Sequence, residues 1–334
     1  MKKIVLLLLG MALLAVVGCR RATEDLYTIG ICQLNDAPTL NAVRDGFIKA
    51  LEDRGFRNGE NISLIFRNAN GDIQVMQKIA REFVQEQVDM IVPFSTPSLQ
   101  AALHASPSIP IVFSSVANPY LAGAGESATA HRPTITGVSS RGPIGESVDF
   151  IHRLLPDVRT LGTLWTPSEL NSEYYLNLAK EAARRNGLNI VAVPIRKTSE
   201  VLIAAQDLVN RNIDVIYQIS DNTTNASFEA LSRVADENRI PLFGGFLLST
   251  EEGAAAALGW DFFDMGYRAG QIALRVKAGE SPAGIPIENM SEVRLYLNLA
   301  AASRQGLIFP DSIIEQADRV LRNDRRASSV SQDD

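Results

Sequence analysis

Strand-like and helix-like stretches alternate along most of the chain, and the same order occurs twice. The first series has strands expected at residues 27–33, 62–66, 90–94 and 111–114, with helices at 40–54, 75–87 and 98–104. The second series has strands expected at 161–165, 189–194, 215–219 and 242–243, with helices at 173–185, 201–210 and 226–238. This alternation predicts parallel sheets, because each parallel connection needs a crossover that helices provide.

Landmark glycines support the repeat. Gly30 and Gly162 lie 132 residues apart, and so do Gly55 and Gly187. A spacing that agrees with the order of the elements indicates internal duplication of one structural unit. We therefore expect an α/β protein of two similar lobes, each a parallel sheet with helices on both faces.

Further helices and strands are expected after the two repeated series, at the end of the chain. A strand at 254–261, a helix at 265–277, a strand at 293–297 and a terminal helix at 312–321 are expected there. The surplus elements can complete different lobes, so we expect three crossings between the lobes, near 136–142, 258–261 and 284–288, which would form a hinge. The predicted parts are lobe one at 27–137 with 262–284, lobe two at 138–261 with 285–321, and a disordered tail at 322–334.

The N-terminus is typical of an exported protein. Lys2 and Lys3 precede an apolar run at 4–17, too short for a stable membrane span, which predicts a signal peptide at 1–18. The run ends in Val16-Val17-Gly18-Cys19, which resembles the lipobox of bacterial lipoproteins. We expect lipidation of Cys19, a tether at 19–26, and a protein anchored to the cell envelope by lipid alone, facing the periplasm or the exterior. A buried cysteine after an ordinary signal peptide is the alternative.

Composition and motifs exclude several classes of protein. The formal charge of −6 argues against a nucleic-acid binder, and 2 Cys with 3 His leave little for a zinc site or a disulfide scaffold. No Gly-x-Ser-x-Gly elbow, Walker A loop, His-Glu-x-x-His or Gly-x-Gly-x-x-Gly after a strand is present. We therefore expect no enzyme activity, no cofactor and no metal.

A cleft between the lobes is the expected binding site, because ligands of open α/β sheets bind beyond the carboxyl ends of the strands. The residues expected to line it are Gln33, Asp36, Thr96, Ser98, Ser115, Asn118, Asn171, Ser172, Asp221, Asn222, Thr223, Phe246 and Asp261. Helix capping is the alternative for the Thr, Ser and Asn residues at helix starts, and helix-dipole stabilisation is the alternative for Asp221.

Several motifs together resemble one family. They are the lipobox, Ile29-Gly30-Ile31-Cys32-Gln33, Arg44-Asp45-Gly46-Phe47, Asn68-Ala69-Asn70-Gly71-Asp72, Thr96-Pro97, Ile109-Pro110-Ile111-Val112-Phe113, Ser220-Asp221-Asn222-Thr223 and Leu258-Gly259-Trp260-Asp261. Over residues 27–318 the chain is similar to substrate-binding lipoproteins of ABC importers with the type I periplasmic-binding fold, some of which bind tryptophan or tyrosine. The resemblance implies a monomer that captures a small solute, often an amino acid, and delivers it to a permease driven by a separate ATPase.

Two loops depart from the family pattern. Asn35-Asp36-Ala37-Pro38 stands where members tend to have His-Pro, and Asn118-Pro119 stands where they have Asp-Pro. Tryptophan or tyrosine therefore does not carry over as the ligand, and the cleft is expected to prefer a different cationic or amide-bearing solute. Asp221 is expected to bind the ammonium of an amino acid while the 96–98 loop meets its carboxylate. An envelope receptor that serves a signalling partner is the alternative function.

Overall fold

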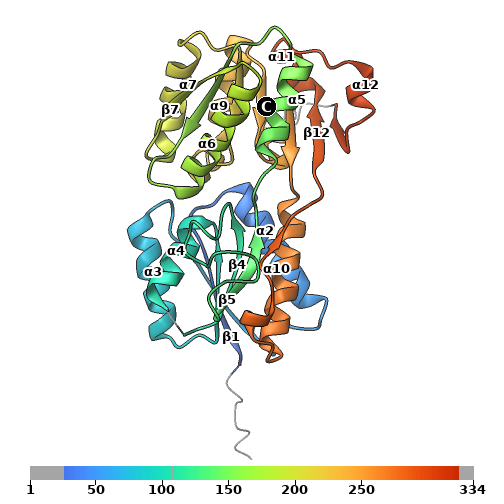
Figure 1. Ribbon diagram of the computed structural model, residues 1–334. Helices are drawn as coiled ribbons and strands as arrows, with labels where there is room; N and C mark the ends of the chain where they lie inside the picture. Colours follow the sequence, from blue (N-terminus) through green and yellow to red (C-terminus); the bar gives the residue numbers. More distant parts are fainter. Residues whose placement is uncertain (1–25, 107, 323–334) are drawn as a thin grey trace, which may run out of the picture.

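The computed structural model describes residues 26–106 and 108–322, which form two lobes stacked end to end (Figure 1). The predicted signal peptide and Cys19 lie outside the described residues, as do residues 323–334 of the predicted tail. In the described part, no helix is both long and apolar enough to cross a membrane.

The first lobe is built on a parallel sheet of six strands among the described residues. They are β1 (Thr28–Gln33), β2 (Ser63–Asn68), β3 (Met90–Phe94), β4 (Ile111–Val116), β5 (Ile135–Ser139) and β11 (Glu288–Asn289), in the spatial order β11-β5-β4-β3-β1-β2. Its helices are α2 (Pro38–Glu52), α3 (Ile73–Gln85), α4 (Thr96–Ala105), α10 (Phe262–Lys277) and the short 3₁₀ turn η3 (Pro282–Gly284). Helices α3 and α4 pack together, as do α2 and α10. The fully buried run of β3 fits a central strand covered on both faces.

Glycines let α10 return to the first lobe and pack closely on α2. A Cβ atom on Gly266 would lie 1.9 Å from the carbonyl oxygen of Val43, and one on Gly46 would lie 2.0 Å from that of Phe263. Only glycine permits such backbone contact between helices. The late segment 262–277 is thereby fixed to the lobe that begins the chain.

The second lobe is built on a sheet of seven strands among the described residues. They are β6 (Thr160–Trp165), β7 (Asn189–Pro194), β8 (Val215–Gln218), β9 (Leu242–Gly244), β10 (Ala256–Gly259), β12 (Arg294–Asn298) and β13 (Arg319–Leu321), in the order β13-β12-β10-β9-β8-β6-β7. Its helical segments are α5 (Ile144–Leu154), α6 (Leu170–Arg185), η1 (Thr198–Glu200), α7 (Val201–Val209), α8 (Asn222–Asn225), α9 (Phe228–Asn238), η2 (Leu247–Thr250), α11 (Leu299–Arg304) and α12 (Asp311–Ile314). Strands β10 and β12 pair antiparallel, and the other pairs are parallel.

The two lobes with predominantly parallel sheets confirm the predicted fold class. The predicted terminal helix at 312–321 is wrong: α12 ends at Ile314, and Arg319–Leu321 pairs with β12 as β13. The reason is a free strand edge, where Leu295 N donates to Asp318 Oδ2 at 2.7 Å and Asp318 N donates to Leu295 O at 2.9 Å. Edge pairing of this kind leaves no periodic signal in the sequence.

The third crossing lies later than expected. Glu288 and Asn289 pair with β5 in the first sheet, and Thr136 Oγ1 donates to Ile285 O at 2.9 Å. Residues 285–289 therefore belong with the first lobe, and the chain passes to the second lobe through 290–293. Strand β5 and helix α5, which flank the first crossing, were also absent from the predicted elements.

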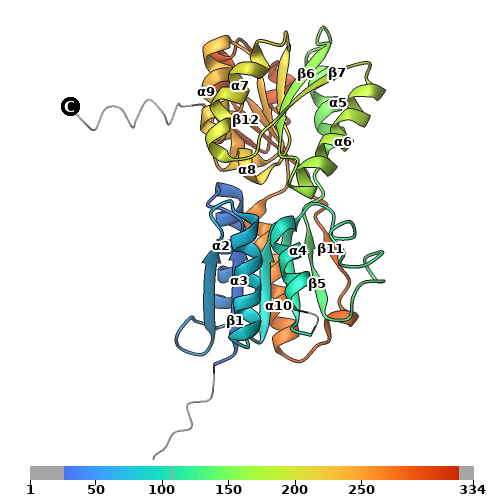
Figure 2. The same cartoon turned by 90° about the vertical axis from the view of Figure 1, so that its left-hand side faces the viewer.

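The lobes are packed against each other. Leu170 at the start of α6 contacts the apolar core of the first lobe, and Ala117 after β4 is part of the core of the second. Another apolar cluster is continuous from Phe47 of the first lobe through Trp260 at the hinge to Phe246 of the second. The lobes are thus in contact, and the strand ends of one lobe face those of the other (Figure 2).

Candidate functional site

A hydrogen bond joins the two lobes at the centre of their interface. Asn35, in the loop after β1, donates from Nδ2 to the backbone oxygen of Asn222 at 2.7 Å. Both residues are at most 9% exposed. The loops beyond β1 and β8, which the sequence placed in the cleft, are therefore in direct contact.

In the first lobe, two amide side chains use their nitrogen atoms and leave their oxygen atoms unused. Gln33 Nε2 donates to Asn35 O at 2.9 Å and to Asn41 Oδ1 at 3.1 Å. Gln33 Oε1 and Asn35 Oδ1 are buried and have no hydrogen-bond partner among the described residues. Buried polar atoms normally have a partner, so these oxygens are candidates for contact with a ligand.

In the second lobe, a buried carboxylate organises the facing loops. Glu169, at the N-terminus of α6 and 1% exposed, accepts from Asn171 Nδ2 at 3.0 Å and from Asn222 Nδ2 at 2.5 Å. It also accepts from the backbone N of Asn222 at 3.2 Å and from Thr223 through N at 3.1 Å and Oγ1 at 2.7 Å. Sequence reasoning missed Glu169, although its neighbours Asn171 and Ser172 were expected to line the cleft.

Asp221 has its oxygens engaged inside the second lobe. Oδ2 accepts from Thr166 N at 3.0 Å, while Oδ1 accepts from Thr166 Oγ1 at 3.1 Å and from Thr224 N at 2.7 Å. Asp221 thus caps α8 and ties it to the end of β6, while Ser172 Oγ accepts from Thr166 N at 2.8 Å. Asp221 therefore lies at the N-terminus of α8, where helix-dipole stabilisation, the alternative expected for it, also acts.

The pKa values of both carboxyl groups are raised. Burial is the larger cause for Glu169, whose pKa is raised to about 7, and the nearby charge of Asp221 adds to it. Burial likewise raises the pKa of Asp221. In the described chain, both carboxyl groups accept hydrogen bonds from neutral Thr, Asn and backbone groups, so no cation among these partners offsets the cost of burying a charge there.

Other predicted site residues have local structural contacts. Ser95 and Ser98 hydroxyls lie 2.9 Å apart at the start of α4, and Thr96 Oγ1 accepts from Ala117 N at 3.3 Å. Ser115 is partly buried at the end of β4 and has a positive φ of 58°. Asn118 Oδ1 accepts from Tyr120 N at 3.1 Å, which stabilises the following turn.

Of the three remaining predicted residues, Asp36 lies at the exposed edge of this polar cluster, because its partner Asn41 also accepts from Gln33, while Phe246 and Asp261 make other contacts. Asp36 is exposed and accepts from Asn41 Nδ2, and Phe246 packs edge-on against Phe228 with ring centroids 5.3 Å apart. Asp261 caps α10 and pairs with Arg294 at 3.1 Å, so it acts at the hinge. The structure thus brings Gln33, Asn171, Asn222 and Thr223 together through Asn35 and Glu169.

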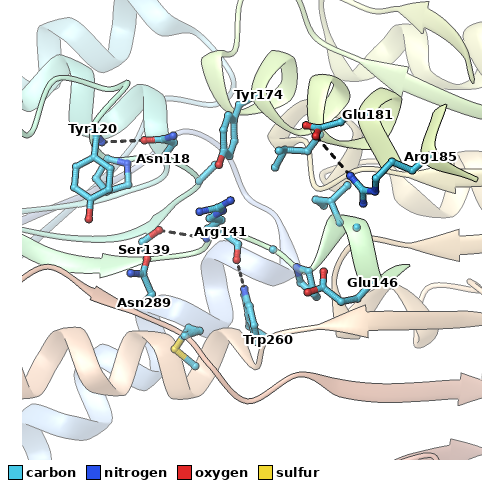
Figure 3. Close-up of a pocket in the computed structure, with 18 residues that line it drawn as sticks. Asn118, Tyr120, Ser139, Arg141, Glu146, Tyr174, Glu181, Arg185, Trp260 and Asn289 are labelled. Atoms are coloured by element: carbon cyan, nitrogen blue, oxygen red, sulfur yellow. Dashed lines mark hydrogen bonds and ion pairs between the residues drawn. The ribbon is translucent and has the colours of Figure 1, made fainter. Parts of the chain in front are cut away.

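A hollow of about 590 Å³ lies beside the hinge (Figure 3). Tyr174, Leu178, Glu181 and Arg185 of α6 form one wall, and loop 117–120 and the crossings form the others. Residues three and four apart share one face of a helix, so the row that includes Tyr174 continues back to Asn171. The hollow therefore lies along α6 from Asn171, and its volume suits a small solute.

The crossings are bonded to one another. Trp260 Nε1 in the second crossing donates to Arg141 O in the first at 2.8 Å (Figure 3). Arg294, after the third crossing, pairs with Asp261 and Asp264 at 3.1 Å each. These bonds link the three crossings side by side, as expected for a hinge in which the crossing segments bend together.

Two α/β lobes, three crossings and buried polar groups between the lobes define a type I periplasmic-binding protein. The family model for ABC transporter substrate binding protein matches residues 28–321, and the chain belongs to this family. A tyrosine-binding protein of Clostridioides difficile strain R20291 is 36% identical over 270 residues, which cover 81% of this chain and 78% of that protein.

Two solved structures give the same fold. A Streptococcus pneumonia ABC domain in complex with L-Trp has a TM-score of 0.84 at 24% identity, and a ligand-free, open substrate-binding protein from Clostridium difficile has 0.65 at 32%. Each match covers 89% of this chain and 100% of the other. The higher score thus belongs to the L-Trp complex, although its sequence identity is lower.

Proposed function

We propose that the protein captures an amino acid or a related small solute between its lobes and delivers it to the permease of an ABC importer. The observation that supports this most directly is the set of buried, unpartnered amide oxygens at the lobe interface, on Gln33, Asn35 and Asn171. Unpartnered buried acceptors are destabilising unless a ligand or water supplies donors. The tyrosine and tryptophan bound by the relatives make an amino acid the first class to test.

The ligand experiment has two steps. Mass spectrometry of the protein purified without refolding should detect a retained solute, and calorimetry with a panel of amino acids, including L-tyrosine and L-tryptophan, should give its affinity. Scattering with and without the bound solute should show compaction, because two lobes on a hinge close as rigid bodies. An unchanged radius of gyration at saturation would contradict capture by closure.

Delivery to the importer is tested in cells. We expect that deletion of the gene abolishes uptake of the identified solute and that the wild-type chain restores it. Intact uptake in the deletion strain, together with loss of a transcriptional response to the solute, would favour the signalling alternative.

The location follows from the family and from the N-terminus. Substrate-binding proteins of ABC importers are extracytoplasmic, and we propose that Cys19 carries the lipid that holds this one at the membrane. Cys19→Ser protein should leave the membrane fraction after a high-salt wash, since one lost anchor removes the stable attachment. Persistent membrane binding of that variant would place the anchor elsewhere.

A further inference from the structure

A carboxylate at the lobe interface decides which way two neighbouring amides face. An ionised carboxylate only accepts hydrogen bonds, whereas an asparagine amide donates from nitrogen and accepts at oxygen. Glu169 receives the Nδ2 atoms of both Asn171 and Asn222, at 3.0 and 2.5 Å. The nitrogen ends must therefore face Glu169, and the oxygen ends must face away from it.

The side-chain amides of Gln33 and Asn35 in the first lobe have the same orientation, with their nitrogen atoms bonded and their oxygen atoms free in the described chain. Asn35 Nδ2 is bound by the backbone oxygen of Asn222, and Gln33 Nε2 by the backbone oxygen of Asn35. The oxygen atoms of Gln33, Asn35 and Asn171 are left buried without a partner among the described residues. These side chains belong to one hydrogen-bonded chain, Gln33–Asn35–Asn222–Glu169–Asn171, that crosses the interface and leaves acceptors unused on both of its sides.

The two buried carboxylates also favour a cationic group of the ligand at this interface. Glu169 and Asp221 are both buried, and their hydrogen-bond partners in the described chain are neutral. A cation placed beside the amide oxygens would gain from both carboxylates at short range in a medium that water does not screen. A second anion or an acceptor group there would be repelled and would lack a donor.

We propose that Glu169 is a positioning residue that fixes the amides of Asn171 and Asn222, so that the interface offers acceptors and selects the protonated primary amine of the solute. The inference rests on the proposed capture of a solute between the lobes. It assigns recognition of the amine to neutral amide oxygens, held in place by a carboxylate that itself does not touch the ligand. The oxygens of Asp221 already accept from Thr166 and Thr224, so Asp221 holds the 221–224 segment in place and is not assigned to the ligand.

The variant Glu169→Met tests the role of the carboxylate. Asn171 and Asn222 both donate to the same atom, Oε2, and a thioether of similar length offers no strong acceptor there, so neither amide is held with its nitrogen toward position 169. Glu173→Met is the matched control, because Glu173 is an exposed carboxylate on the next turn of α6. Thermal unfolding monitored by circular dichroism checks that both variants are folded.

Calorimetry with L-tyrosine and L-tryptophan and with their deaminated analogues, 3-(4-hydroxyphenyl)propanoate and 3-(indol-3-yl)propanoate, measures selectivity for the amine. Wild type should prefer the amino acids at least about a hundredfold, because a site built for a hydrogen-bonding group rejects an analogue without it. Glu169→Met should weaken binding of the amino acids at least about tenfold and binding of the analogues little, so the preference for the amine falls. An unchanged preference in Glu169→Met would overturn the proposal.

Side-chain amide NMR of the ligand-free protein is the second readout. At a pH above 7, where Glu169 is ionised, the NH₂ signals of Asn171 and Asn222 should be protected from exchange in wild type and in Glu173→Met, and should lose that protection in Glu169→Met. Signals that stay unchanged would refute the positioning role. Wild-type protein that binds neither amino acid would contradict the proposed amino-acid ligand, while the NMR comparison would still decide the role of Glu169.

Discussion

The buried carboxyl group of Glu169 should make stability depend on pH in a way that one substitution removes. Its pKa is raised from the ordinary 4.5 to about 7, mainly by burial and further by the charge of Asp221. The folded protein therefore keeps this proton up to a higher pH than the unfolded chain does. The stabilising contribution is complete below pH 4.5 and is lost as the pH rises to about 7.

The magnitude follows from the two pKa values. A difference between 4.5 and about 7 corresponds to about 3 kcal/mol of the free energy of unfolding, since one pKa unit is worth about 1.4 kcal/mol. Glu169→Gln keeps a neutral side chain at every pH, so it should lack this decline. Relative to wild type, the variant should gain about 3 kcal/mol between pH 4.5 and a pH above 7.

Urea unfolding at a series of pH values measures this difference, with the fluorescence of Trp165 and Trp260 as the signal. Subtracting the two curves cancels the titration of groups that the variants share. Glu173→Gln should run parallel to wild type, because Glu173 is exposed. If the Glu169→Gln curve also runs parallel to wild type, the buried carboxyl does not titrate as argued.

Further predictions concern binding, packing and the interlobe contact. The affinity for an amine solute should rise with pH up to about 7, because a bound cation favours the ionised form of Glu169. Calorimetry in buffers of different ionisation enthalpy should detect proton release on binding. An affinity that does not depend on pH would contradict this prediction. Gly266→Ala should lower the free energy of unfolding by about 1–3 kcal/mol or more, because its Cβ would lie 1.9 Å from Val43 O. Gly284→Ala has open space around it, so its free energy of unfolding should stay within about 0.5 kcal/mol of the wild-type value. Equal loss in both variants would refute the packing argument. Asp221→Asn should cost about 1–3 kcal/mol of stability in urea unfolding, because an NH₂ group would face the N–H donors of Thr166 or Thr224, and unchanged stability would contradict the capping role. Asn35→Ala should weaken solute binding about tenfold by removing the bond to Asn222 O, whereas Asn58→Ala, distant from the cleft, should bind as wild type does; calorimetry decides.

The lobes could be predicted from the sequence because their signals are local and repeated. Apolar runs such as 90–94 and glycines such as Gly55 and Gly187 report on their own strand or turn. Strand β13 could not be predicted in this way, since Arg319–Leu321 becomes a strand only because the edge of β12 is free beside it. Pairing that is decided by a partner segment is invisible to periodicity.

The sequence could place the loops of the candidate site but not their hydrogen bonds. Asp221 follows a buried strand, as the apolar run 215–219 predicts, yet its contacts depend on Thr166, 55 residues earlier, whose N–H reaches it at 3.0 Å. Glu169 resembles any acidic residue near a helix start, where the helix dipole would explain it. Its place two positions before Asn171 and four before the predicted helix at 173–185 is a local signal that could have singled it out.

The close packing of α10 on α2 also sets the order in which the protein can fold. Helix α10 and strand β11 complete the first lobe, but they are made after most of the second lobe. A chain that emerges N-terminus first therefore exposes the glycine-bearing face of α2 until residue 277 has appeared. The first lobe therefore cannot be completed until residues 262–289 have been made, and a chain that is not yet folded can still be threaded through a translocation channel.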